Sequence, residues 1–150
     1  MPRTQQLEVV QRVADDEERR FAQRLAAAER RVKESEAKLA ELTAYQAGYA
    51  GDFARRASGG LDGARVRHFQ TFLARLGEAV RQQSEIVDRA RTERDAELER
   101  WRRAAQRSQM VGRVVQSRRD EARGESDRRE QREADERTLV RRRDREEPST

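Results

Sequence analysis

The sequence of 150 residues contains no cysteine and a single histidine. Without cysteine, the chain can form neither a disulfide framework nor a thiolate metal site. His68 has no second imidazole with which to share a metal ion, so we expect it to be a surface residue. We therefore expect no catalytic residues, no bound metal and no cofactor.

Proline and apolar residues are also scarce. Proline occurs only at Pro2 and Pro148, so nothing between these two positions forbids an α-helix. Apolar residues make up 34% of the chain and aromatic residues 5%, whereas a globular domain needs about half its residues apolar. No apolar run approaches the length of a membrane span, and the N-terminal segment lacks the apolar centre of a signal peptide. We expect a cytoplasmic protein without a globular core.

What the sequence does contain is a narrow apolar stripe in each half, on either side of the glycine-rich segment 58–63. Its residues follow alternating steps of three and four, with polar interruptions at Gln83, Arg94, Glu97 and Ser108. Such spacing keeps a seam on one side of an α-helix, where it is buried against another helix. The expected seam residues are Phe21, Leu25, Ala28, Val32, Leu39, Phe69, Leu73, Val80, Val87 and Trp101.

Two seams joined by a glycine-bearing turn predict an all-α fold, a long two-helix antiparallel coiled-coil hairpin. Thr4 and Asp62 are the expected N-caps of the two helices. A single uninterrupted helix that dimerises is the competing fold, but three glycines within five residues argue against it. The expected boundaries are a helix over about 5–54, a turn over about 55–62 and a helix over about 63–146, within one domain over residues 1–150.

The second predicted helix is longer than the first. Paired outward from the turn, the first helix is used up when the second reaches about residue 113. Beyond that point the seam positions are almost all charged, so the segment has nothing to bury. We expect an overhanging C-terminal helix that either frays or becomes ordered when it docks on a partner.

The charge is high but evenly mixed, with a formal net charge of +5. Basic and acidic residues number 11 and 10 in residues 1–60, 11 and 8 in 61–110, and 12 and 11 in 111–150. Nucleic-acid binding needs a one-sided basic stripe, so this pattern favours solvated helix faces. The turn segment Ser58-Gly59-Gly60 also lacks the lysine of a phosphate-binding loop. We expect no nucleic-acid partner, no small-molecule substrate and no enzymatic activity.

The aromatic residues gather on both sides of the turn. Tyr45, Tyr49 and Phe53 close the first predicted helix, and Phe69 and Phe72 open the second, so a hairpin brings them together. Phe72, Leu76 and Ala79 form a second stripe beside the seam. A two-helix hairpin buries one stripe per helix, so this surplus surface indicates a third helix or a partner. In the alternative interpretation, Phe72 only shields the seam.

At these residues the sequence resembles the flagellar export protein FliJ family. Segment 42–49, Leu-Thr-Ala-Tyr-Gln-Ala-Gly-Tyr, matches the family pattern Leu-x-x-Tyr-Gln-x-x-Tyr. Segment 69–79 has an aromatic residue, glutamine, phenylalanine, leucine and alanine at the family's offsets. The resemblance covers roughly residues 39–83, and the rest agrees only in helical character.

The resemblance implies a non-enzymatic, soluble component of the flagellar type III export apparatus. The family looks like the stalk of rotary ATPases: a coiled coil that enters the hexameric export ATPase, links it to the membrane export gate and escorts export chaperones. It implies a cytoplasmic protein, peripherally associated with the inner membrane at the flagellar base. The ATPase-inserting part would be the termini, about Leu7 to Phe21 and Val111 onward. The gate-contacting residues carried over by position are Phe72, Leu76 and Ala79, with Leu42, Tyr45 and Tyr49.

Two alternative functions remain open from the residues alone. A basic coiled coil could bridge nucleic acid, although the even charge distribution speaks against it. A homodimeric scaffold without any ATPase partner would use the same seams between two chains.

Overall fold

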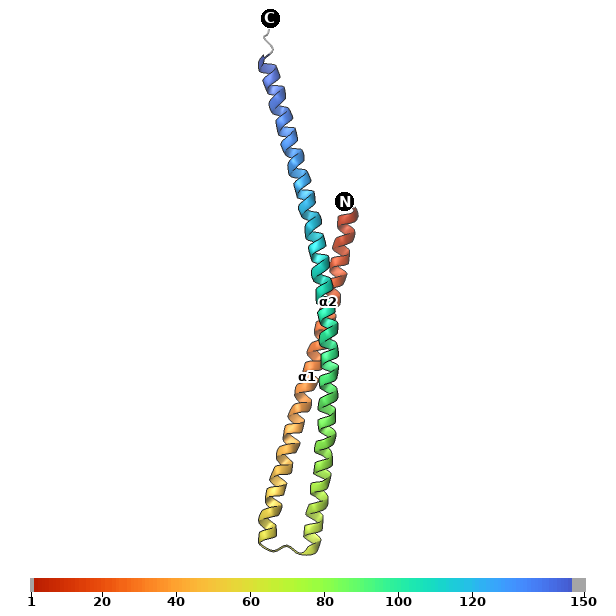
Figure 1. Ribbon diagram of the computed structural model, residues 1–150, viewed down its shortest axis with the longest axis vertical. Helices are drawn as coiled ribbons and strands as arrows, with labels where there is room; N and C mark the ends of the chain where they lie inside the picture. Colours follow the sequence, from red (N-terminus) through yellow and green to blue (C-terminus); the bar gives the residue numbers. More distant parts are fainter. Residues whose placement is uncertain (1, 147–150) are drawn as a thin grey trace. The chain divides into compact units, whose positions relative to one another are not determined.

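The computed structural model describes residues 2–146 and contains two α-helices, with no strand among these residues (Figure 1). Helix α1 spans Pro2–Ser58 and helix α2 spans Gly63–Glu146. The two helices pack against each other in opposite directions, which confirms the prediction of an all-α helical hairpin. Pro148, which we expected to follow the end of the second helix, lies outside the described residues.

Helix α1 is longer than the expected span of about 5–54. It begins at Pro2, where proline is well suited to the first helical position because its missing N–H has no intrahelical acceptor there. Thr4 lies inside the helix, so its prediction as the N-cap was wrong. At the other end the helix continues to Ser58, whose Oγ donates a hydrogen bond of 2.7 Å to the Arg55 carbonyl oxygen.

The connection between the helices is short and depends on one glycine conformation. The amides of Gly59 and Gly60 donate hydrogen bonds to the carbonyl oxygens of Arg56 and Ala57, each 3.2 Å long, which tightens the end of α1. Gly60 has a φ of 87°, in the left-handed region that favours glycine. Asp62 caps α2, as predicted, because its Oδ1 accepts a hydrogen bond of 2.9 Å from the Arg65 amide.

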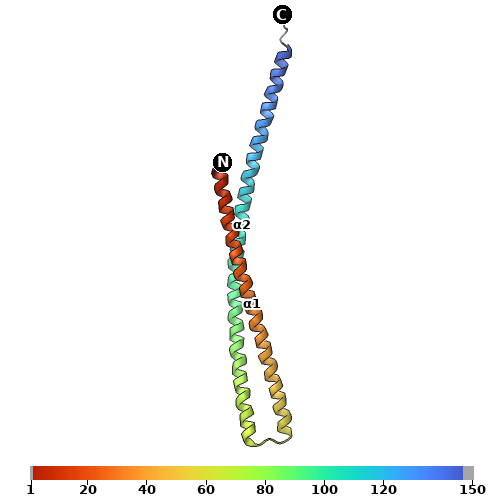
Figure 2. The ribbon, with the colours of Figure 1, turned by 180° about the vertical axis from the view of Figure 1, so that it is seen from behind.

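The described residues fall into two compact units, each formed by a segment of α1 and a segment of α2. Unit 1 comprises Met1–Glu17 and Ala105–Thr150, of which residues 2–17 and 105–146 are described. Unit 2 comprises Glu18–Ala104 and contains the turn. Within unit 2, both views of the ribbon show the two segments side by side (Figures 1 and 2).

In unit 2 the two segments meet along the predicted seam. Its buried apolar residues are small or β-branched: Ala28, Val32, Val87, Ala90 and Ala104. Small side chains bring two helix backbones close together, so little apolar area is needed to exclude water. The other expected seam residues are half-buried: Phe21, Leu25, Leu39, Phe69, Leu73, Val80 and Trp101.

In unit 1 the helices are joined by polar contacts around a small apolar centre of Ala14 and Val115. The contacts are an Arg107–Glu17 ion pair of 2.7 Å, an Arg119–Glu8 ion pair of 3.0 Å and a hydrogen bond of 2.5 Å from Ser108 Oγ to Asp15 Oδ1. Pairing therefore extends to residue 119 rather than ending near 113, because the register places Arg119 within reach of Glu8, which lies inside the expected first helix. Residues 125–146 of α2 are exposed throughout.

Candidate partner-binding site

Aromatic rings from both helices contact one another near the turn in unit 2. The Tyr49 ring lies 4.5 Å from Phe72, 5.4 Å from Tyr45 and 6.4 Å from Phe69, measured between ring centroids. Phe53 and Phe69 extend this group with a separation of 5.6 Å. The ring planes are tilted relative to each other, and aromatic pairs prefer such arrangements to face-to-face stacking. The hairpin thus brings together five rings from two separate stretches of sequence.

The six residues expected to contact a partner form what we call the apolar patch: Leu42, Tyr45, Tyr49, Phe72, Leu76 and Ala79. Ring contacts join Tyr45, Tyr49 and Phe72, and the other three share their helix faces by steps of three and four. Tyr45 is 56% exposed, and the other five are half-buried. Phe72 both packs on Tyr49 and keeps part of its surface accessible.

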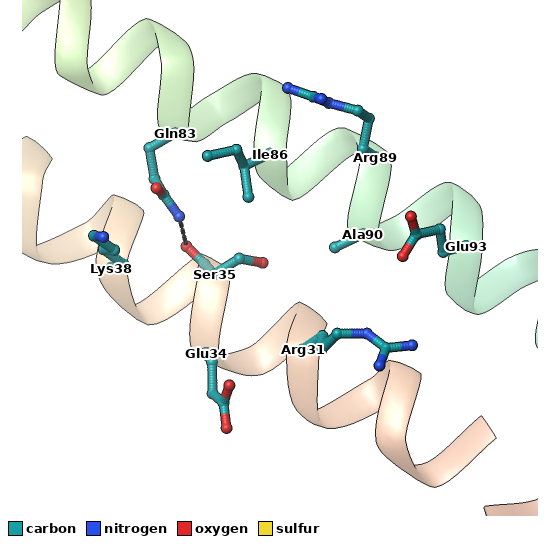
Figure 3. A pocket seen from close by; sticks show the side chains of 9 residues that line it. All are labelled: Arg31, Glu34, Ser35, Lys38, Gln83, Ile86, Arg89, Ala90 and Glu93. Carbon is teal, nitrogen blue, oxygen red and sulfur yellow. Dashed lines mark hydrogen bonds between the residues drawn. The ribbon is translucent and has the colours of Figure 1, made fainter. Parts of the chain in front are cut away.

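Farther from the turn, a polar layer interrupts the seam. Gln83 is only 6% exposed, and its Nε2 donates a hydrogen bond of 3.0 Å across to the carbonyl oxygen of Ser35 (Figure 3). The Ser35 hydroxyl donates in turn to the Val32 carbonyl oxygen at 3.0 Å. Gln83 is recognisable from the sequence as a polar seam position. Its acceptor is not, because a backbone carbonyl leaves no trace in the sequence pattern.

Beside the polar layer lies an open groove of about 470 Å³, formed by both helices of unit 2 (Figure 3). Its one large apolar side chain, Ile86, is 44% exposed. The side chains of the five charged residues in its lining form no hydrogen bond or ion pair in the part of the chain that the structure describes. The lining consists of Arg31, Glu34, Ser35, Lys38, Gln83, Ile86, Arg89, Ala90 and Glu93.

On the opposite flank of unit 2 a cross-helix ion pair spans the seam, beside a second open hollow of about 640 Å³ that is lined by α1 and Arg91. Arg91 donates through Nε and Nη2 to Glu36 Oε1, at 3.1 and 2.9 Å. Two donors on one carboxylate oxygen hold these side chains across the seam. The two flanks of unit 2 therefore differ, since an ion pair crosses the seam beside one hollow and none crosses it at the other among the described residues.

The chemistry of the face that carries the apolar patch and the groove suits contact with another protein. It combines partly exposed apolar and aromatic side chains with solvated charges, the composition typical of an interface. Within residues 2–146, no group of three or more His, Cys, Asp or Glu residues is arranged to hold a metal ion. Over the same range, neither helix has a stretch that is long and apolar enough to cross a membrane.

Comparison with known proteins places the chain in a family. Neither the curated proteins nor the solved structures contain a match to it. The model of the family described as Flagellar FliJ protein matches residues 3–147, nearly the whole chain. The rings that meet in unit 2 belong to the two segments that match the family pattern, as Tyr45 and Tyr49 lie in segment 42–49 and Phe69 and Phe72 in segment 69–79. This chain therefore belongs to the FliJ family, whose members are components of the flagellar export apparatus.

Proposed function

We propose that this protein is a non-enzymatic, stalk-like adaptor of flagellar type III export. It binds the hexameric export ATPase, links it to the cytoplasmic part of the membrane export gate and escorts export chaperones. It works in the cytoplasm, peripherally associated with the inner membrane at the flagellar base. Family membership and the paired helices of both units support this proposal.

The observation that carries the proposed gate contact is the packing of Tyr49 on Phe72 at 4.5 Å. This contact joins the two segments that match the family pattern and gathers the apolar patch on one face. Large, rigid aromatic side chains that remain partly exposed are the residues that most often dominate protein interfaces. The apolar patch is therefore our candidate for the gate contact.

The proposed ATPase contact lies in the terminal segments, about Leu7 to Phe21 and Val111 onward. In unit 1 several apolar side chains are more than half exposed: Val9, Val13 and Met110. The same unit carries partly exposed ion pairs, and such pairs contribute only about 0–1 kcal/mol each. A surface of this kind contacts the inside of a ring without binding it rigidly.

The test is a full-length double variant, Phe72→Ala with Leu76→Ala. Both side chains are half-buried, so the helices should form as before, with unchanged circular dichroism. We expect the variant to lose binding to the cytoplasmic part of the export gate and to abolish swimming motility. The matched control is Met110→Ala with Val114→Ala, two exposed apolar positions of unit 1, which should retain gate binding. Full motility in the Phe72/Leu76 variant would contradict the proposed patch.

A further inference from the structure

We infer that the groove around Ile86 is a second half of the partner-binding face and takes one amphipathic α-helix of a partner protein. The partner helix places an aliphatic residue against Ile86 and acidic residues against Arg31 and Lys38. This inference rests on the proposed function, because the groove shares its helix faces with the apolar patch. It adds a binding surface with its own chemistry to the contact near the turn.

The groove continues the apolar patch along the same two helix faces. On α1 the patch residue Leu42 is followed, going away from the turn, by Lys38, Ser35 and Arg31, in steps of four, three and four. Such steps keep residues on one face of an α-helix. The same rule connects patch and groove on α2, where the run is Ala79, Gln83, Ile86, Ala90 and Glu93. A partner bound at the patch therefore meets the groove without changing face.

The two flanks of unit 2 differ in how a third helix can reach both α1 and α2. On the opposite flank a hollow of about 640 Å³ is lined by α1 and by Arg91 alone of α2, and the Arg91–Glu36 ion pair spans the seam there and would have to break before a helix could pack between the two helices at that level. On the groove side no such bridge exists among the described residues, and Ile86 is left 44% exposed. Two packed helices form a furrow into which the side-chain ridges of a third helix fit.

The polar side chain at the floor of the groove already has a hydrogen-bond partner within the hairpin. Gln83 donates to the Ser35 carbonyl oxygen, so its side-chain amide keeps this hydrogen bond when a helix covers it. Around it, Ile86 and Ala90 supply apolar surface, and the carbon stems of Arg31 and Lys38 can extend that surface while their charges stay in water. Covering this groove therefore removes apolar area from water at little polar cost.

The charges of the rim point to an acidic helix. Three cations and two anions line the groove, and none of them has a partner among the described residues. Arg31 and Lys38 lie seven residues apart on α1, or about 10 Å along the axis. Two carboxylates about two turns apart on a partner helix would meet both cations. With Glu34 and Glu93 among the three cations, the rim is not the one-sided basic surface that a run of phosphates requires, so it favours a protein segment, in which single carboxylates can be placed opposite single cations.

The experiment measures binding of the full-length protein to the purified cytoplasmic part of the export gate, by titration calorimetry. The chain has only two lysines, Lys33 and Lys38, which are both exposed and lie on the same helix. Lys33 does not line the groove, so Lys33→Glu is the matched control for Lys38→Glu. We expect Lys38→Glu combined with Arg31→Glu to weaken binding about tenfold at low salt and less at high salt. Lys33→Glu should change it less than about twofold.

A second pair of variants tests the proposed apolar contact of the partner helix with Ile86. Ile86→Ala should weaken binding about fivefold, while Val114→Ala, an exposed apolar position of unit 1, should leave it unchanged. Helical circular dichroism and the melting temperature of each variant establish that the hairpin is intact. Full-strength binding of all groove variants, with binding still lost in Phe72→Ala, would overturn the inference and leave the proposed function standing.

Other outcomes separate the two proposals further. Loss of binding in the groove variants with normal binding of Phe72→Ala would support the groove and refute the apolar patch. Failure of the unaltered protein to bind the gate would refute both. A mass that doubles at high concentration, and returns to that of one chain in Ile86→Lys, would mean that a second copy of this chain occupies the groove. That result would overturn the assignment to a partner protein.

Discussion

At the scale of single residues, the turn depends on Gly60, the one described residue with a positive φ, 87°. A side chain in this conformation crowds the backbone, so Gly60→Ala should lower the free energy of unfolding by about 1 kcal/mol. Gly48 offers the matched control, because it is helical and a Cβ there would meet no atom within 4 Å. Gly48→Ala should raise the same free energy by up to about 1 kcal/mol. Urea unfolding measures both, and equal effects of the two changes would contradict the assigned turn.

Glu97 is a second residue with a specific consequence. Its Oε1 pairs with Arg100 at 2.9 Å, but its Oε2 is buried without a hydrogen-bond partner. A buried oxygen without a partner costs stability, so Glu97→Leu at this seam position should stabilise the hairpin by about 1 kcal/mol. Glu99 is exposed and pairs with Arg103. Glu99→Leu should therefore change stability by less than about 0.5 kcal/mol, and an equal gain in both variants would argue against this explanation.

Single residues also show where sequence reasoning works. Asp62 was predictable as an N-cap because its type and its place before a helical stripe are both visible in the sequence. Thr4 has an equally suitable type, yet Pro2 starts the helix before it, so local preference gave the wrong residue. The Gln83–Ser35 hydrogen bond was not predictable, because its acceptor belongs to the backbone and the exact register decides the pairing.

At the scale of the helical segments, unit 2 is not packed uniformly. Beyond the polar layer from the turn, Val32, Val87 and Ala90 are buried, whereas between that layer and the turn the seam residues are only half-buried. The less buried stretch also contains Gly48, Gly51 and Gly77. Fewer buried contacts and weaker helix propensity both lower the free energy of local opening.

We therefore expect backbone amides in segments 39–56 and 66–80 to exchange with deuterium faster than those in 25–34 and 87–97. Hydrogen–deuterium exchange with mass spectrometry resolves these segments. Gly77→Ala is a useful probe, because a Cβ there meets Gln46 Nε2 at an ordinary distance of 3.5 Å. This substitution should slow exchange in 66–80. Uniform protection along unit 2 would show that the half-buried seam is as stable as the rest.

The helical segments illustrate a limit of pattern analysis. The seam in each half is visible in the sequence because burial selects residue type every three or four positions. The length of pairing was less predictable, since unit 1 adds the polar contacts Arg119–Glu8 and Ser108–Asp15 to an apolar centre of only Ala14 and Val115. Charged residues that pair across helices and charged residues that stay solvated look the same in one sequence. The open groove was not predictable either, because the charged residues of its lining look in the sequence like any solvated helix face.

At the scale of the whole molecule, the cross-helix contacts in each unit are made within one chain. The unfolding midpoint of an intramolecular hairpin does not depend on protein concentration, whereas that of a dimer rises with it. We expect the same thermal midpoint, within about 1 °C, over a roughly hundredfold range of concentration. Calorimetry and circular dichroism together cover that range. A midpoint that rises steadily with concentration would favour the competing fold, a continuous helix paired with a second copy.

The family could be identified from the sequence because its specific residues are the aromatic and glutamine positions next to the turn. These positions are also the ones that the fold brings together, with Tyr49 on Phe72. The terminal segments carry no comparable pattern, which is why the resemblance assigned no single residue there.

The four-residue connection between Ser58 and Gly63 also has a consequence for how the chain acquires its structure. Contacts near it join residues close in sequence, whereas Gln83 and Ser35 are 48 residues apart and Arg119 and Glu8 are 111 apart. The entropy lost on closing a loop grows with the length of that loop, and early contacts shorten the loops that remain. Folding should therefore begin at the aromatic rings and proceed like a zipper toward the termini. On the ribosome, the first helix must wait, with its seam uncovered, until the second is synthesised.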